Sequence, residues 1–167
     1  MEIRLAQLHE LPILEKLARA IWPSTYAQII SAEQIEFMLN WMYSTIKLQE
    51  QYLQGHEFYL LSENGIDLGF LALEWMHTDE DPAKNQIKIN KLYVLPQLQK
   101  KGFGSALIQK AITRAQQTNA IKLILQVNKA NSAKIFYQKL GFSIQQEAVF
   151  DIGNGFVMDD YIMELSV

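Results

Sequence analysis

One strand–loop–helix segment constrains the fold more than any other part of this 167-residue chain. Its first part, QIKINKLYV, alternates in character and predicts a strand whose odd-numbered residues, from Ile87 to Tyr93, share one side. After a short polar stretch, Gly102 and Gly104 open a run of apolar residues at helical spacing. A strand that leads through a glycine-rich loop into a helix favours a fold that packs helices on a sheet.

Changes in hydrophobic period place the remaining elements. Asn64-Gly65 is a strong hairpin signal between two strands, and Ser31 with Gln34 three residues later forms a capping-box pattern for a helix. A helical stripe that starts near Leu11 is expected to be interrupted near Pro23. The predicted order is β-α-α-β-β-β-α-β-α-β-β. We therefore predict an α/β (α+β) fold, with a mixed twisted sheet of about seven strands flanked by helices on both faces, in a single domain over residues 1–167.

Composition excludes several classes of protein. The chain has no cysteine, which rules out disulfides, thiolate metal sites and a cysteine nucleophile. His9, His56 and His77 are widely spaced and predict no metal site. The sequence shows neither a membrane-length apolar run nor the pattern of a secretory signal at its start. We expect a cytoplasmic protein without a metal or a membrane partner.

The net charge of −3 hides a strong separation of charge along the chain. Eleven of the fifteen Lys and Arg residues lie between Lys84 and Lys139, where no acid occurs, and all eighteen acids lie elsewhere. Such asymmetry indicates that one region faces an anion, although basic side chains on solvated helix faces would give the same pattern.

The glycine-rich helix start is a candidate anion site. The first N–H groups of a helix have no intrahelical partner, and the helix dipole adds positive charge there. Glycine at 102 and 104 lets a phosphate approach the backbone, while Lys100 and Lys101 add charge and Ser105 adds a hydroxyl. Neither the P-loop pattern nor the dinucleotide-binding pattern with its third glycine is present.

Two blocks of sequence resemble the GNAT N-acetyltransferases. VLPQLQKKGFGSALI is similar to the acetyl-CoA pyrophosphate loop of that family, Q/R-x-x-G-x-G/A. NKANSAKIFYQKLGF is similar to its second block, in which Asn131, Ala133, Tyr137, Gly141 and Phe142 match. The resemblance implies the GNAT fold and transfer of the acetyl group of acetyl-CoA to an amine by direct attack in a ternary complex.

The resemblance also implies a set of cofactor-binding residues. The strand residues Leu92, Tyr93 and Val94 are expected to line the pantetheine arm, and Asn128 and Asn131 to touch pantetheine or adenosine. Val94 and Phe136 could instead be core residues, Asn128 could merely end a strand, and Asn131 could serve only as a helix N-cap. The full expected set is Leu92, Tyr93, Val94, Gln99, Lys100, Lys101, Gly102, Phe103, Gly104, Ser105, Asn128, Asn131, Ala133, Phe136 and Tyr137.

Tyr137 is the expected catalytic residue, as the acid that protonates the leaving thiolate. The strand before the loop lacks the glutamate that several family members use as a base. Glu74, the acids from Asp79 to Asp81, and the pair Asp159-Asp160 are candidate bases, and the sequence does not choose among them.

The acceptor is expected to be a small cationic amine, because acids dominate the rest of the chain. Trp22, Tyr26 and Glu74 are the candidate acceptor-binding residues, through cation–π contacts and charge, whereas Trp41 is expected in the core. IWPSTYAQIIS and the C-terminal DDYIMEL resemble the bacterial spermidine/spermine acetyltransferase subgroup, which implies a polyamine. A protein or peptide N-terminal acetyltransferase and a non-catalytic CoA-binding protein are the alternatives. We expect no nucleic-acid partner, since the lysines lie opposite apolar helix stripes, and the sequence leaves a homodimer open.

Overall fold

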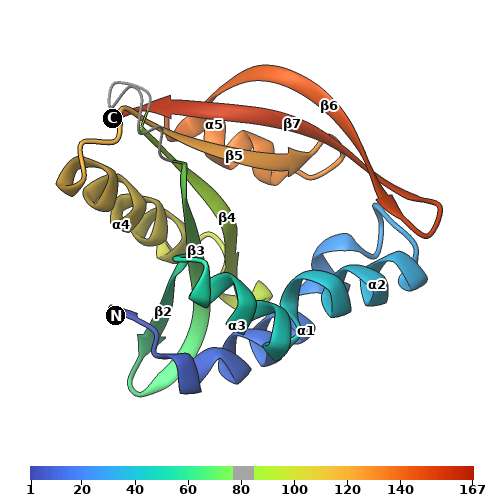
Figure 1. Ribbon diagram of the computed structural model, residues 1–167, viewed down its shortest axis with the longest axis horizontal. Helices are drawn as coiled ribbons and strands as arrows, with labels where there is room; N and C mark the ends of the chain where they lie inside the picture. Colours follow the sequence, from blue (N-terminus) through green and yellow to red (C-terminus); the bar gives the residue numbers. More distant parts are fainter. Residues whose placement is uncertain (77–84) are drawn as a thin grey trace. The chain divides into compact units, whose positions relative to one another are not determined.

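The computed structural model describes residues 1–76 and 85–167 and contains one seven-stranded sheet flanked by helices (Figure 1). The strands lie in the order β1-β2-β3-β4-β5-β7-β6, which confirms the predicted fold class. The helices and strands are β1 (Glu2–Leu5), α1 (Leu11–Tyr26), α2 (Ala32–Tyr43), α3 (Thr45–Leu53), β2 (Glu57–Glu63), β3 (Ile66–Met76), β4 (Gln86–Val94), α4 (Phe103–Gln117), β5 (Lys122–Asn128), α5 (Ala133–Lys139), β6 (Ser143–Gly153) and β7 (Phe156–Ser166), with short 3-10 turns at Leu8–Glu10 and Pro96–Leu98.

The contacts divide the chain into two compact units. The first unit comprises residues 1–74 and 90–111, and the second comprises residues 75–89 and 112–167. Strands β3 and β4 each contribute residues to both units. The single domain over residues 1–167 stays a prediction.

In the first unit, helices cover both faces of the sheet. The central residues of β2 and β3 form uninterrupted buried runs, which requires cover on both sides. Lys110 of α4 lies over the ring of Tyr59 on β2, and Tyr43 of α2 packs edge-on against Phe70 of β3. Tyr59 pairs with Leu71 in the β2–β3 register, so strand alternation puts Tyr59 and Phe70 on opposite faces.

The second unit is built on β5. This strand pairs in parallel with the first half of β4, from Gln86↔Lys122 to Ile89↔Leu125, and antiparallel with β7 along its whole length. β6 pairs with β7 and forms the edge of the sheet. Helix α5 lies on the face to which Tyr161 points, because Lys134 of α5 sits 4.8 Å above that ring.

A predicted hairpin turn and a predicted helix cap are both present in the structure. Asn64 and Gly65 take positive φ angles of 51° and 77°, as a tight hairpin between β2 and β3 requires. The Ser31 side chain accepts a hydrogen bond from the Gln34 N–H at 3.1 Å and caps α2.

The predicted break at Pro23 is wrong, because α1 continues through Pro23 to Tyr26. A proline in a helix interior removes one N–H donor and crowds the preceding turn. Just beyond it, the hydroxyls of Ser24 and Thr25 both donate to the Ile21 carbonyl, at 2.9 and 3.0 Å. The backbone hydrogen bonds of the helix continue beyond this point, where the Ala27 N–H donates to the Pro23 carbonyl at 3.1 Å.

Gly69 lets β3 and β4 approach each other closely. A Cβ at this position would lie 2.5 Å from the Tyr93 carbonyl oxygen and 3.1 Å from Val94 Cα. Both neighbours are backbone atoms, so no side-chain movement can relieve the overlap. Close by, the Leu95 N–H donates to the Leu68 carbonyl at 2.9 Å. The position of the last residues of β4 therefore depends on the absence of a side chain at Gly69.

We predict that Gly69→Ala lowers the free energy of unfolding by about 1–3 kcal/mol, because overpacking against backbone forces β4 to move. Urea unfolding followed by circular dichroism measures the change. Ile66→Ala, at an exposed position on the same strand, is the matched control and should stay within about 0.5 kcal/mol of wild type. Equal, small effects of both substitutions would contradict the close approach.

Candidate active site

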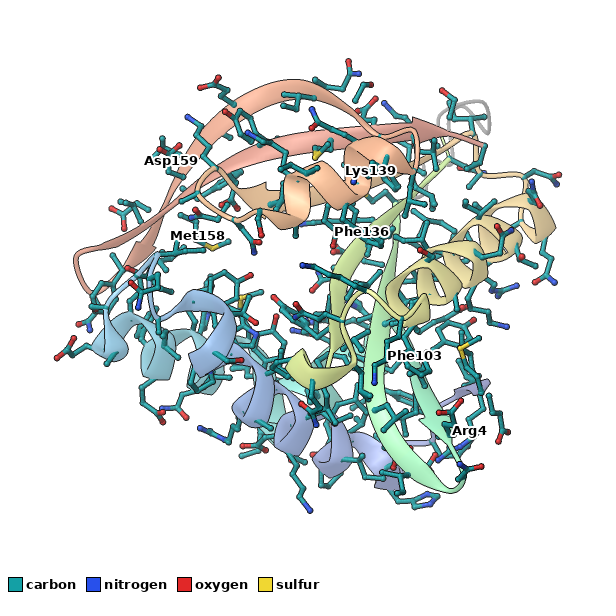
Figure 2. All side chains as sticks on the ribbon, turned by 180° about the vertical axis from the view of Figure 1, so that it is seen from behind. Arg4, Phe103, Phe136, Lys139, Met158 and Asp159 are labelled. Carbon is teal, nitrogen blue, oxygen red and sulfur yellow. The ribbon has the colours of Figure 1, made fainter. Side chains whose placement is uncertain are left out.

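The loop between β4 and α4 has the backbone conformation of an anion-binding turn. Lys100 and Gly102 both take left-handed φ angles, 64° and 88°, of the kind that anion-binding turns contain. The first intrahelical bond of α4 runs from the Ala106 N–H to the Gly102 carbonyl at 3.0 Å, so the three preceding N–H groups, from Phe103 to Ser105, lie outside the helical ladder. Figure 2 labels Phe103, the buried first residue of α4.

The space over this loop is open. A Cβ added at Gly102 would meet nothing within 4 Å, so glycine is required there by its φ angle and not by crowding. Lys100, Lys101 and Gly102 are exposed, as is Ser105. Free N–H groups, the positive end of a helix and two lysines fit the diphosphate of coenzyme A.

The last residues of β4 are held in an aromatic cluster of the first unit. The Tyr93 hydroxyl lies 3.2 Å from both the Tyr26 hydroxyl and the Tyr43 hydroxyl. The Trp22 ring packs on the same group, 4.3 Å from the Tyr26 ring and 5.2 Å from the Tyr43 ring between centroids. Trp22 is buried, and its Nε1 finds no hydrogen-bond partner among the described residues, whereas Tyr26 and Tyr93 are half-buried.

Glu74 is joined through Asn90 to a buried lysine. Lys91 is only 1% exposed, and its Nζ donates to Gln51 Oε1 at 2.8 Å and to Asn90 Oδ1 at 2.7 Å. The Asn90 amide then donates to Glu74 Oε2 at 2.9 Å. Lys91 Nζ also lies 5.2 Å from the centre of the Tyr43 ring. Glu74 is thus connected to the buried Lys91 by two consecutive hydrogen bonds through Asn90.

Helix α5 in the second unit carries Tyr137. This residue is 8% exposed, and burial raises the pKa of its phenol to about 12. Its ring packs against Phe136 and Phe142, with centroids 5.2 and 5.8 Å away. A phenol with so high a pKa stays protonated at neutral pH and can donate a proton. Phe136, labelled in Figure 2 together with Lys139 of the same helix, is half-buried.

The two asparagines expected at the cofactor stabilise the turn before α5. Asn128 Oδ1 accepts from the Ala130 N–H at 3.0 Å, and Asn131 Oδ1 accepts from the Ala133 N–H at 2.9 Å. Both carboxamide oxygens are therefore used by the local backbone, although the N-cap of α5 is Ser132 and not Asn131. Their contact with a cofactor stays a prediction.

The candidate bases differ sharply in their surroundings. Asp159 forms an ion pair with Lys129 at 2.7 Å, whereas Asp160 is 1% exposed and burial, with the neighbouring Asp159, raises its pKa to about 6. The acids from Asp79 to Asp81 lie outside the described residues. Strand alternation along the DDYIM stretch was the one sequence signal that could have separated Asp160 from Asp159.

Trp41 corrects another expectation from the sequence. It was expected in the core, yet it is 45% exposed and packs against Phe37 on the outer side of α2, with ring centroids 6.1 Å apart. Trp22, one helix earlier, is the tryptophan of this region that is buried.

Comparison with known proteins identifies the family of this chain. The sequence model of the acetyltransferase (GNAT) domain matches residues 54–144, more than half of the chain. A spermidine N(1)-acetyltransferase of Thermoplasma acidophilum is 27% identical over 165 residues, covering 95% of this chain and 96% of the relative. A [ribosomal protein bS18]-alanine N-acetyltransferase of Haemophilus influenzae is 29% identical over 120 residues, covering 71% of this chain and 75% of the relative.

A solved structure extends the similarity to three dimensions. The PaiA N-acetyltransferase of Thermoplasma acidophilum, crystallised with coenzyme A, superposes with a TM-score of 0.82 at 26% identity, covering 99% of this chain and 98% of that one. Fold and loop together define an acyl-CoA-dependent N-acyltransferase. The chain belongs to the GNAT family and is an acetyl-CoA-dependent N-acetyltransferase, as the resemblance implied.

Within residues 1–76 and 85–167, no helix is both long and apolar enough to span a bilayer. In the same ranges, no group of three or more His, Asp or Glu side chains could hold a metal ion.

We predict that Gly102→Val raises the KM for acetyl-CoA about tenfold or more, because a β-branched residue does not tolerate the φ of 88° and the loop must change shape. Steady-state kinetics with varied acetyl-CoA measures the effect. Gly55→Val is the matched control, since Gly55 has a φ of 92° and equally open surroundings at the end of α3. The assignment of the loop fails if both variants keep the wild-type KM.

Proposed function

We propose that the enzyme acetylates a small cationic amine, with a polyamine as the leading candidate. The observation that carries this proposal is the similarity to a spermidine N(1)-acetyltransferase over nearly the whole length of both chains. The concentration of acids outside residues 84–139 supports it, because a cationic acceptor is drawn toward negative charge. A cytoplasmic location and a homodimeric assembly stay predictions.

We assign the acetyl-CoA-binding residues to segments of both units. In the first unit, the Gln99–Ser105 loop would hold the diphosphate through its N–H groups and through Lys100 and Lys101. The end of β4, from Leu92 to Val94, would bind the pantetheine arm. In the second unit, the proposed contacts are Asn128, Asn131, Ala133, Phe136 and Tyr137.

The reaction makes three demands on these residues. A primary amine with a pKa near ~10.4 must lose a proton before it can attack, which costs about 4–5 kcal/mol at pH 7. Negative charge then grows on the thioester oxygen, and the N–H of Val94 is the proposed donor that stabilises it. Finally the C–S bond breaks, and the hydroxyl of Tyr137 gives its proton to the departing thiolate.

The proposed acceptor-binding residues are Trp22, Tyr26 and Glu74. Tyr26 is half-buried and offers an aromatic face for a cation, while the buried Trp22 supports it from behind at 4.3 Å. Glu74 has one oxygen bonded to Asn90. We assign its negative charge an electrostatic part in attracting the cationic acceptor.

An amino-terminal peptide acceptor is the second candidate. It is favoured by the similarity to a [ribosomal protein bS18]-alanine N-acetyltransferase, which covers a smaller share of both chains. A protein that binds acetyl-CoA without transferring the acetyl group is the remaining alternative. The three possibilities differ in which acceptor, if any, leads to release of coenzyme A.

We expect release of coenzyme A with spermidine, spermine or a diamine at a kcat/KM at least about tenfold higher than with alanine-terminal peptides. The chain has no cysteine, so a thiol reagent detects only the product. Mass spectrometry of the acceptor confirms where the acetyl group goes. Faster turnover of the peptides would replace the polyamine proposal, and binding of acetyl-CoA without turnover of any acceptor would favour the non-catalytic alternative.

Tyr137→Phe is expected to lower kcat about 10²–10⁴-fold, because the thiolate loses its proton donor, while the KM for acetyl-CoA changes less than about threefold. Tyr161→Phe is the matched control in the same unit; its phenol ring lies under Lys134, and removing its hydroxyl should leave kcat unchanged. Wild-type turnover in Tyr137→Phe would remove the proposed acid and leave the rest of the assignment standing.

A further inference from the structure

Asp160 is a buried carboxylate with no hydrogen-bonded or ion-paired partner in residues 1–76 and 85–167. It lies in the middle of β7 with a side chain that is 1% exposed. Its Oδ1 is fully buried and accepts no hydrogen bond within the described part of the chain, nor does any ion pair there involve this residue. An unpaired buried carboxylate costs several kcal/mol, so its presence calls for a cation or a proton donor beyond those that the described residues supply.

The adjacent residue, Asp159, has a different environment. Lys129 Nζ lies 2.7 Å from Asp159 Oδ1 and 2.7 Å from Glu147 Oε2, so both of these acids share one lysine. Both also remain largely accessible to water. Figure 2 labels Asp159 and Met158, which mark the part of β7 that leads into Asp160. The nearby cation is thus engaged by Asp159 and Glu147.

Strand register places Asp160 beside a residue assigned to the cofactor. Asp160 lies directly opposite Asn128 on β5 and Ala148 on β6, neither of which carries charge. Alternation along β7 turns Asp160 away from the face to which Tyr161 points and on which α5 packs. Asp160 and the proposed acid on α5 therefore belong to opposite faces of the same part of the sheet.

Charged neighbours tune this carboxylate in opposite directions. Burial and, to a smaller extent, the negative charge of Asp159 raise its pKa to about 6, although the positive charge of Lys88 on β4 acts to lower it. Farther along the same face of β7, Glu164 is paired with Lys122 at 2.9 Å. On β6, the charged neighbour Glu147 is held by Lys129. A group of this kind is deprotonated at neutral pH and still basic enough to accept a proton.

We propose that Asp160 is the base of the acetyl transfer and pairs with the ammonium group of the acceptor, an inference that rests on the proposed function. The N–H bond of the ammonium breaks and its proton passes to a carboxylate oxygen of Asp160, which leaves a neutral amine. The amine nitrogen forms the new C–N bond as the C–S bond breaks. Tyr137 protonates the thiolate and recovers the second proton of the nitrogen, and Asp160 later releases its proton to water.

The test is the pH dependence of kcat/KM for the amine. In the wild type it should rise with pH and level off above about 6, since the base must be unprotonated. Asp160→Asn should lower kcat/KM about 10²–10⁴-fold at pH 7.5 and remove this plateau. Its rate should then climb steadily toward pH 10, where the amine loses its proton without help. The KM for acetyl-CoA should stay unchanged, and thermal melting checks that the variant folds.

Substitutions at two charged neighbours of Asp160 should shift the pH profile, and a purely structural role of Asp160 would not produce such shifts. Asp159→Asn removes a negative neighbour and should shift the acidic limb of the profile to lower pH. Lys88→Gln removes a positive neighbour and should shift it to higher pH. Because both retain Asp160, both should keep a plateau, and both remain informative if Asp160→Asn does not fold.

The possible results separate the two proposals. An active wild type whose pH profile is unaffected by Asp160→Asn overturns the assignment of the base and leaves the proposed function intact. The assignment of Asp160 as the base is also overturned if the acidic limb of the pH profile stays at the wild-type position in both Asp159→Asn and Lys88→Gln. A wild type that binds acetyl-CoA but releases no coenzyme A with any amine overturns the proposed function, and the base assignment with it.

Discussion

The alternation of side chains along β4 is the constraint on which the first unit and its candidate site depend. Ile87 and Ile89 are buried, and the next residue on that side is Lys91, which is buried as well. Tyr93 lies on the same side of the strand, and its hydroxyl is within hydrogen-bond distance of the hydroxyls of Tyr26 and Tyr43. The strand then leads directly into the loop with its two left-handed residues. One strand therefore fixes both the aromatic cluster and the starting point of the proposed diphosphate site.

The buried Lys91 has a cost that its neighbours must offset. A buried ammonium group is tolerated where hydrogen bonds replace its water shell, and Gln51 and Asn90 supply two of them. Through Asn90 this network reaches the carboxylate of Glu74. In consequence, Glu74 is hydrogen-bonded through Asn90, whereas Asp160 Oδ1 has no hydrogen-bond partner within the described residues. This contrast, more than sequence position, distinguishes the surroundings of the two carboxylates.

Local chemistry made much of the fold predictable. The Asn64-Gly65 hairpin, the Ser31 cap and the strand–loop–helix segment act through nearest neighbours, so their residues carry the information themselves. Two expectations failed. Helix α1 continues through Pro23, beyond which the hydroxyls of Ser24 and Thr25 bond the Ile21 carbonyl. Trp41 of α2 is exposed beside Phe37 of the same helix. A pattern within one helix cannot show which apolar residue the neighbouring elements will cover.

The candidate site divides in the same way. The residues of the Gln99–Ser105 loop could be found because spacing and glycine directly reflect backbone geometry. Burial of Lys91 and isolation of Asp160 depend on register between strands, which a single sequence does not state. Asp159 and Asp160 are neighbours of identical chemistry, and only the pairing of β7 with β5 and β6 gives one a lysine and the other none.

The contact between Gly69 and the Tyr93 carbonyl also limits how this part of the chain can change in length. Adding or deleting a single residue within β3 after Gly69, or within β4 before Tyr93, would bring a side chain opposite that oxygen or turn the alternating residues of β4 to the other face. The ammonium group of Lys91 would leave its amide partners, and three phenols would no longer meet. Variation in this region is thus confined to exchanges of side chains, and insertions are expected only beyond the ends of the two strands.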